Sequence, residues 1–157
     1  MTGYAEIAVT SNYSFLRGAS HPQELIAAAA ALGLCAIGIA DRNSLAGVVR
    51  AWDALNRLRE SGAATPKLLV GARLVFADGT ADVLAYPQDR AAYGRLCRLL
   101  SLGKHRARKG DAEIRVRKRR VLNRLFKNKI VHNSGQLHIQ GRLIYYALNQ
   151  PDNVSSV

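Results

Sequence analysis

The chain has 157 residues, which is enough for one domain with its own hydrophobic core. Hydrophobic residues make up 48% of it and charged residues 22%, values that exclude wholesale disorder. The net charge of +12 ordinarily indicates an anionic partner such as nucleic acid, but residues 114–157 hold nine basic side chains and one acidic, against 14 and 10 in residues 1–113.

Nothing in the sequence indicates a membrane or secreted protein. The longest apolar stretch, residues 25–40, is interrupted by two glycines and is too weakly apolar to cross a bilayer. The N-terminal residues lack a basic region followed by an apolar run, so we expect no secretory signal and a cytoplasmic location. Cys35 and Cys97 have no neighbour at metal-ligand spacing, and we expect both to be reduced thiols in the core.

The predicted elements begin with a strand over residues 4–11, followed by a polar turn. A helix then begins at Ser20, which is a suitable N-cap, and Gln23 three residues later completes a capping box. The helix is rich in alanine and ends at Gly33, because glycine accepts the left-handed conformation that closes helices.

The next segment, residues 34–40, is a nearly continuous apolar run before Asp41, as is typical of a parallel strand buried on both faces. A second helix is expected over residues 45–60, and a third strand over residues 67–76. The apolar residues of this second helix recur at helical spacing: Val48, Val49, Trp52, Leu55 and Leu58.

Asp78-Gly79 supplies a turn that predicts a hairpin between the third strand and residues 81–86. A further helix over residues 89–102 packs through Tyr93, Leu96, Leu99 and Leu100. The order β-α-β-α-β-β-α predicts an α/β fold with a mainly parallel sheet. From Gly103 onward we expect a basic loop.

Residues 1–113 and 114–157 differ in composition, since 23 alanines lie in the first part and one in the second. We therefore expect a partial folded domain over residues 1–113 and a basic tail of different composition over residues 114–157, for which a frameshift, disorder and a genuine added segment are the alternatives. The tail contains Tyr145 and Tyr146, which either stack on bases or belong to a short strand. The loop and tail together offer a nucleic-acid surface, if their charge was selected for that purpose, formed by Lys104, Arg106, Arg108, Lys109, Arg115, Arg117, Lys118, Arg119 and Arg120.

Functional groups of parallel α/β folds gather at the carboxyl ends of the strands, here Thr10-Ser11, Asp41-Arg42 and residues 71–73. Around these positions, the sequence closely resembles the N-terminal part of bacterial error-prone DNA polymerases, which are relatives of the replicative alpha subunit. The resemblance covers residues 4–113 and is carried by the strings VTSNYSFLRGASHPQEL, ALGLCAIGIADRNSLAGVVRA, LLVGARLVFADG and LAYPQDRAAYGRLCRLLSLGK.

This resemblance implies a polymerase-and-histidinol-phosphatase (PHP) domain, a distorted TIM-like β/α barrel that in active relatives holds a metal cluster for phosphoester hydrolysis. We expect only part of the barrel, with a β-hairpin and then the basic tail. The His-x-His motif of active relatives falls on Ala8 and Thr10, and their Asp-His pair on Asp41 and Arg42. Arg73 replaces a later glutamate, so the resemblance implies a vestigial site without metal.

Asp41 is either a surviving metal ligand or a structural carboxylate that pairs with Arg42 or Arg73 or caps the following turn. We favour the structural role, because one carboxylate among cations does not make a site for two metals. His21 is expected at the surface in the first turn of a helix. His105, His132 and His138 are scattered without metal-ligand spacing.

The resemblance therefore implies an N-terminal PHP fragment that acts as a scaffold and interaction module. We expect no polymerase chemistry and no cofactor in this chain, although the parent family uses Mg²⁺ and has DNA and other polymerase or damage-tolerance subunits as partners. One alternative is a PHP-type metal-dependent phosphoesterase, and another is a small basic nucleic-acid-binding protein. An incomplete barrel leaves an open strand edge and apolar faces, so the isolated chain is predicted to aggregate or be marginally stable.

Overall fold

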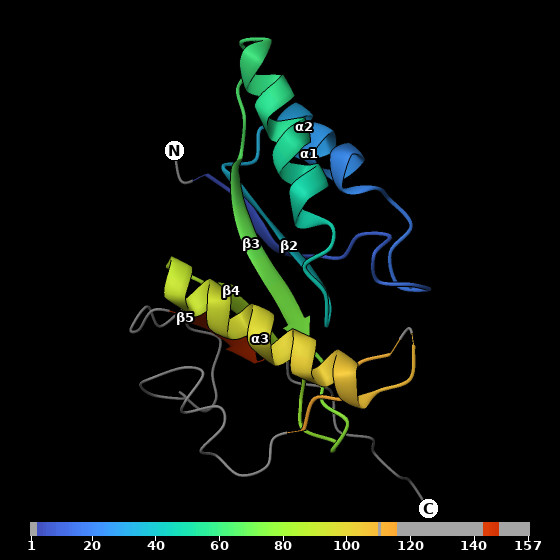
Figure 1. Cartoon of the computed structure of the whole chain (residues 1–157). Helices are drawn as coiled ribbons and strands as arrows, with labels where there is room; N and C mark the ends of the chain where they lie inside the picture. The colour runs from blue at the N-terminus through green and yellow to red at the C-terminus, as the bar shows by residue number, and fades with distance from the viewer. Residues whose placement is uncertain (1–2, 110, 116–142, 148–157) are drawn as a thin grey trace, which may run out of the picture.

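The computed structural model describes residues 3–109, 111–115 and 143–147, the last as backbone (Figure 1). The expected order of helices and strands is confirmed, and one strand follows it. The elements are β1 Ala5–Val9, α1 Pro22–Ala31, β2 Ala36–Arg42, α2 Val48–Glu60, β3 Lys67–Leu74, β4 Val83–Pro87, α3 Arg90–Arg106 and β5 Leu143–Ala147.

The strands form one sheet in the order β1-β2-β3-β4-β5. β1, β2 and β3 are parallel, whereas β4 pairs antiparallel with β3 and β5 antiparallel with β4. The sheet is therefore parallel in its first three strands and antiparallel in the remainder. The α/β class and the hairpin are confirmed, with Gly79 at a φ of +77° in the connection between β3 and β4.

Helices α1 and α2 pack together over one face of the parallel strands (Figure 1). Each of these two helices connects two neighbouring parallel strands, and the strands follow one another in one direction across the sheet. Because such connections are right-handed, both helices lie on the same face. The core beneath them consists of Ile26 and Ala29 from α1, Ile37 and Ile39 from β2, and Ala51 and Leu55 from α2.

Helix α3 covers the same sheet farther along, over β3 and β4 (Figure 1). Its Leu96 and Leu100 pack against Ala72, Leu74, Phe76, Val83, Ala85 and Ile114. Ile114 lies just beyond the helix, forms an isolated bridge with Phe76, and is 3% exposed. Gly103 and Ile114, which are buried beside each other, thus close one end of the core.

The opposite face of the sheet carries a smaller apolar cluster formed by Ala40, Leu84 and Tyr86, with Ala8 and Leu69 against it. Two glycines make room for the aromatic ring. A Cβ atom on Gly71 would lie 2.3 Å from Cε1 of Tyr86, and one on Gly38 would lie 2.9 Å from its hydroxyl oxygen. Tyr86 therefore extends from β4 across β3 and β2.

The first turn of α1 differs from expectation by one residue. The N-cap of α1 is His21, whose backbone N–H donates to Oε2 of Glu24, so the capping box lies one residue beyond Ser20 and Gln23. Both α1 and α2 end in a glycine at positive φ, Gly33 and Gly62, and the expected stop at Gly33 is confirmed.

The predicted apolar face of α2 is partly wrong. Val49 is 75% exposed and Trp52 51% exposed, whereas Ala51 is fully buried in place of these larger residues. Tyr93 on α3 is likewise partly exposed, and this helix continues to Arg106, so Lys104 and Arg106 lie in its last turn rather than in a loop. Within the described residues, no helix has the length and apolarity needed to cross a membrane.

Candidate functional site

The carboxyl ends of β1, β2 and β3 lie at one edge of the sheet, as expected from their parallel pairing. Asp41 and Arg42 end β2, and Arg73 lies opposite Arg42 in register on β3. Thr10 follows β1 directly. Thr10, Asp41, Arg42 and Arg73 therefore lie at one edge of the sheet.

The Asp41 carboxylate is buried at this edge and accepts hydrogen bonds from the neighbouring loop. It is 1% exposed, and its two oxygens accept three hydrogen bonds from the loop that follows β1. The donors are the N–H of Ser11 at 2.8 Å, the hydroxyl of Ser11 at 2.7 Å and the hydroxyl of Ser14 at 2.7 Å. The carboxylate thus holds this loop against the end of β2, and its partners are Ser11 and Ser14 rather than Arg42 or Arg73.

The two arginines occupy the other face of the sheet. Side chains alternate along a strand, so Arg42 lies on the same face as Ala40 and away from Asp41. Arg73 pairs with Leu84 of the same apolar cluster and is half-buried, whereas Arg42 is exposed. In the described part of the chain neither guanidinium forms an ion pair or a hydrogen bond.

Tyr86 lies beside the arginine pair. Its hydroxyl donates to the main-chain oxygen of Ile7 on β1. Burial raises the pKa of Tyr86 well above its ordinary value, and the nearby positive charge of Arg73 only partly opposes that rise. The raised pKa favours the protonated phenol that donates this hydrogen bond.

These residues do not fit the metal cluster that active PHP relatives hold. Ala8 offers no ligand atom and Thr10 only a hydroxyl, while Arg42 and Arg73 bring positive charge to ligand positions. Asp41 already uses both oxygens on Ser11 and Ser14. Among the described residues, no three His, Cys, Asp or Glu side chains are grouped to bind a metal ion.

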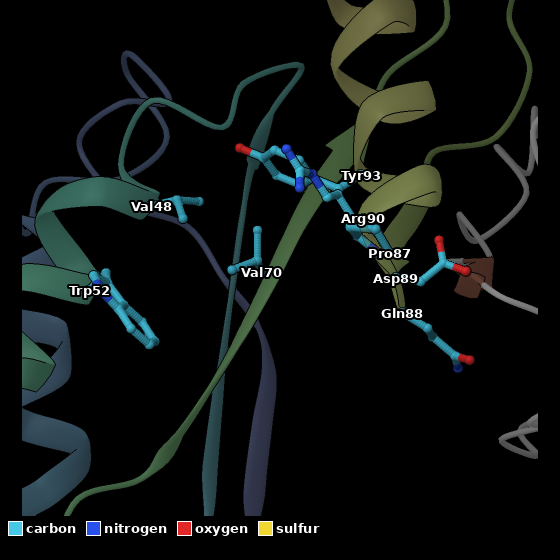
Figure 2. A pocket seen from close by; sticks show the side chains of 8 residues that line it. All are labelled: Val48, Trp52, Val70, Pro87, Gln88, Asp89, Arg90 and Tyr93. Atoms are coloured by element: carbon cyan, nitrogen blue, oxygen red, sulfur yellow. The ribbon is translucent and has the colours of Figure 1, made fainter.

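A second feature is a groove of about 420 Å³ between α2 and α3 (Figure 2). Trp52 and Val48 line it from α2 and Tyr93 from α3, with Val70 at its base. The guanidinium carbon of Arg59 lies 5.5 Å from the ring centre of Trp52, a cation-π contact. This groove lies on the helix-covered face, away from the arginine pair.

The basic residues proposed to bind nucleic acid are only partly described. Lys104 and Arg106 are exposed in the last turn of α3, and Arg108 and Lys109 follow it, also exposed. Arg115 pairs with Glu113. The remaining candidates, Arg117, Lys118, Arg119 and Arg120, lie outside the described residues.

The histidines and cysteines show no shared site in the described residues. Nδ1 of His21 lies 2.8 Å from Nδ2 of Asn12, and His105 is exposed at the end of α3. Cys35 is exposed, so the prediction that it lies in the core is wrong, whereas Cys97 is half-buried. His132 and His138 lie outside the described residues, and Tyr145 and Tyr146 belong to β5.

The sequence placed Ser11 at a strand end but did not predict its hydrogen bonds to Asp41, and Ser14 and Tyr86 were not identified. Two serines three residues apart, directly after a strand and at the same edge as a lone aspartate, were a usable signal for Ser11 and Ser14. Gly38 and Gly71 inside apolar strands were the corresponding signal for Tyr86, because a glycine in a strand often marks close approach of another group.

Comparison with known proteins gives one family and a consistent set of relatives. The PHP domain family matches residues 6–156. An error-prone DNA polymerase from Rhodopseudomonas palustris (strain BisA53) is 68% identical over 111 residues, which cover 71% of this chain and 10% of that protein. One from Bradyrhizobium diazoefficiens is 51% identical over 134 residues, or 85% of this chain and 11% of the relative. The chain thus spans about a tenth of these relatives.

Two solved structures share the fold, each with a TM-score of 0.50 and 24% identity. One is assigned as a metal-dependent phosphoesterase from Bifidobacterium adolescentis, and the match covers 67% of this chain and 34% of that one. The other is an amidohydrolase from Chromobacterium violaceum with bound sulfate and no metal, with coverage of 65% and 34%.

Proposed function

The chain belongs to the PHP domain family, and on that premise we propose that it serves as a metal-free PHP module matching the N-terminal region of error-prone DNA polymerases. In this role the domain is a scaffold and interaction surface for polymerase chemistry that takes place elsewhere. We propose DNA and other polymerase or damage-tolerance subunits as the partners of the complete protein. We also propose a cytoplasmic location, because bacterial polymerases work on DNA there.

The proposal rests on which residues occupy the positions where the family's active members bind metal. Hydrolysis of a phosphoester by a PHP centre requires clustered ligands that bind metal ions and lower the pKa of bound water. Here Asp41 is committed to Ser11 and Ser14, while Arg42 and Arg73 put guanidinium groups, which do not coordinate metal, at two further positions where the resemblance implies ligands. The PHP-type phosphoesterase is therefore the weaker alternative.

Nucleotidyl transfer by these residues is also unsupported. A polymerase holds two metal ions on acidic side chains, and no group of three such ligands occurs among the described residues. Since the chain spans about a tenth of its relatives, we propose that the activity in their names belongs to segments outside it.

The test is an activity assay on the purified chain. Hydrolysis of p-nitrophenyl phosphate and its diester is measured with Mn²⁺, Zn²⁺ or Mg²⁺, and primer extension is measured with Mg²⁺ and nucleotides. We expect both rates to equal the buffer control. Hydrolysis that requires added metal and stops on chelation, or incorporation above the control, would contradict the proposal.

A nucleic-acid-binding role has one specific observation in its favour. Helix α3 and the residues after it present four exposed cations, Lys104, Arg106, Arg108 and Lys109. Binding through phosphates must weaken steeply with salt. Removing residues 114–157 is a poor test, because Ile114 belongs to the core. The sharper test replaces these four cations with Gln, and unchanged affinity for DNA would exclude this surface.

A further inference from the structure

The pairing of Arg42 with Arg73 has a structural consequence beyond the loss of a metal site. The two residues are register partners on adjacent parallel strands, whose spacing is about 4.8 Å. Both side chains leave the sheet on the face that carries Ala40, Leu84 and Tyr86. The two side chains therefore start from neighbouring points on the same face of the sheet.

The backbone of both arginines is held in place. The N–H of Arg42 donates to the hydroxyl of Ser14 at 2.8 Å, and the carbonyl of Arg73 accepts from the N–H of Asn43 at 2.9 Å. The Asn43 side chain continues the pairing with two hydrogen bonds to the backbone of Val75. The separation of the two Cα atoms is thus fixed before any ligand binds, which reduces the entropy cost of binding.

No ion pair in the described residues neutralises Arg42 or Arg73, although the Glu6 carboxylate lies near enough to Tyr86 to raise its pKa. Asp41 lies on the other face and is saturated by serine donors, and Glu6 accepts from the Tyr4 hydroxyl and the Ala8 N–H. The ion pairs among the described residues join Arg57 with Asp53 and Arg115 with Glu113. A guanidinium group carries a positive charge at physiological pH.

The surface below the pair strengthens its interaction with an anion. Leu84, Ala40 and the Tyr86 ring form an apolar floor, and the Tyr86 hydroxyl is already used on Ile7. Charges beside an apolar surface are screened less than charges in open water. A guanidinium offers two parallel N–H donors that match the oxygens of a phosphoryl group.

We propose that Arg42 and Arg73 form a binding site for a phosphoryl dianion, with each guanidinium donating to phosphate oxygens above the Tyr86 floor. The ligand class is a phosphate monoester or pyrophosphate, either free or as the terminal phosphate of a nucleic acid. A site of this kind binds without any metal. The proposed phosphate site uses the same residues as the argument for a metal-free module. The two claims are separate, because the module can lack metal whether or not it binds phosphate.

The test titrates the full chain with inorganic phosphate and pyrophosphate at constant ionic strength set by chloride. Arginine Nε–Hε NMR signals report binding directly, and calorimetry gives the Kd. We expect the signals of Arg42 and Arg73 to shift together. Arg42→Gln or Arg73→Gln should each raise the Kd about tenfold, the effect of losing one charge-assisted contact.

The matched control is Arg50→Gln/Arg57→Gln, which removes two exposed cations from α2 and should leave the Kd unchanged. Circular dichroism and thermal melting check that each variant is folded. The proposal is overturned if Arg42→Gln/Arg73→Gln binds as tightly as the wild type, or if phosphate shifts the two signals no more than chloride does. Neither result affects the activity assay that tests the proposed function.

The source of the phosphate is distinguished by oligonucleotides that carry either a 5′-phosphate or a 5′-hydroxyl. Preference for the phosphorylated end that disappears in Arg42→Gln/Arg73→Gln assigns the site to nucleic-acid ends. Equal binding of both oligonucleotides, together with pyrophosphate binding that depends on the arginines, assigns it to free phosphate compounds.

Discussion

The hydroxyl of Tyr86 donates to the main-chain oxygen of Ile7, and this hydrogen bond joins β4 to β1 across the two strands between them. The two residues are 79 positions apart in sequence. The bond ties the antiparallel hairpin to the first parallel strand on the face that carries the arginine pair.

Tyr86→Phe removes this hydrogen bond and leaves the Ile7 carbonyl without its partner. We expect the free energy of unfolding to fall by about 1–2 kcal/mol. Urea denaturation followed by circular dichroism measures the change. Tyr4→Phe is the matched control, because the Tyr4 hydroxyl bonds to Glu6 at the exposed surface and its loss should change stability little. Equal effects of the two substitutions would contradict the structural role of Tyr86.

The raised pKa of Tyr86 predicts a specific loss of stability in alkali. Because burial raises the Tyr86 pKa in the folded state, the folded chain keeps the hydroxyl proton at a pH where the unfolded chain has lost it. The stability that Tyr86 contributes is therefore complete below the ordinary pKa of tyrosine and declines above it. Unfolding free energies measured from pH 8 to 11.5 should fall more steeply for the wild type than for Tyr86→Phe. The comparison is needed because the pKa of Tyr4 and that of Tyr93 are also raised. Parallel pH profiles would exclude this linkage.

Gly71→Ala and Gly94→Ala should have opposite effects. A Cβ on Gly71 would lie 2.3 Å from the Tyr86 ring, so this substitution should destabilise the chain by about 1–3 kcal/mol. Gly94 lies inside α3 with no atom within 4 Å of an added Cβ, so alanine there should stabilise by about 0.5–1 kcal/mol. Thermal melting of both variants checks the sign, and a neutral Gly71→Ala would mean that Tyr86 does not lie across β3.

Asp41→Ala should detach the loop after β1. Three buried donors on Ser11 and Ser14 lose their acceptor, and we expect a loss of at least about 2–3 kcal/mol. Limited proteolysis should also cut residues 11–20 faster. The control is Asp53→Ala, which breaks an exposed ion pair with Arg57 and should cost less than about 1 kcal/mol. Similar costs for the two variants would show that Asp41 is not a structural centre.

Much of the fold could be predicted because its signals are local. Gly33 ends α1, and the apolar run before Asp41 forms the buried strand β2. Periodicity failed on α2, where Ala51 is buried while the larger Trp52 lies at the groove, because the pattern does not say which apolar side faces the sheet. The basic residues that begin at Lys104 were predicted to form a loop, but Lys104 lies in the last turn of α3. Basic residues are as compatible with a helix end as with a loop.

The site was harder to predict because its contacts are distant in sequence. The positions of Arg42 and Arg73 could be identified, yet their pairing in register depends on how β2 and β3 align. The partners of Asp41 lie 27 and 30 residues before it, and a short hydroxyl side chain gives no signal of its own across such a separation. Only the folded loop brings Ser11 and Ser14 to the carboxylate.

The most direct test of the metal-free module is a measurement of divalent metal bound to the purified wild-type chain. Mn²⁺ titration followed by electron paramagnetic resonance, with elemental analysis for Zn²⁺ and Fe²⁺, gives the stoichiometry. We predict no saturable binding, because Asp41 is committed to Ser11 and Ser14 and guanidinium groups occupy positions 42 and 73. Stoichiometric metal that is lost when Asp41 is replaced by Asn in a chain that remains folded would contradict it.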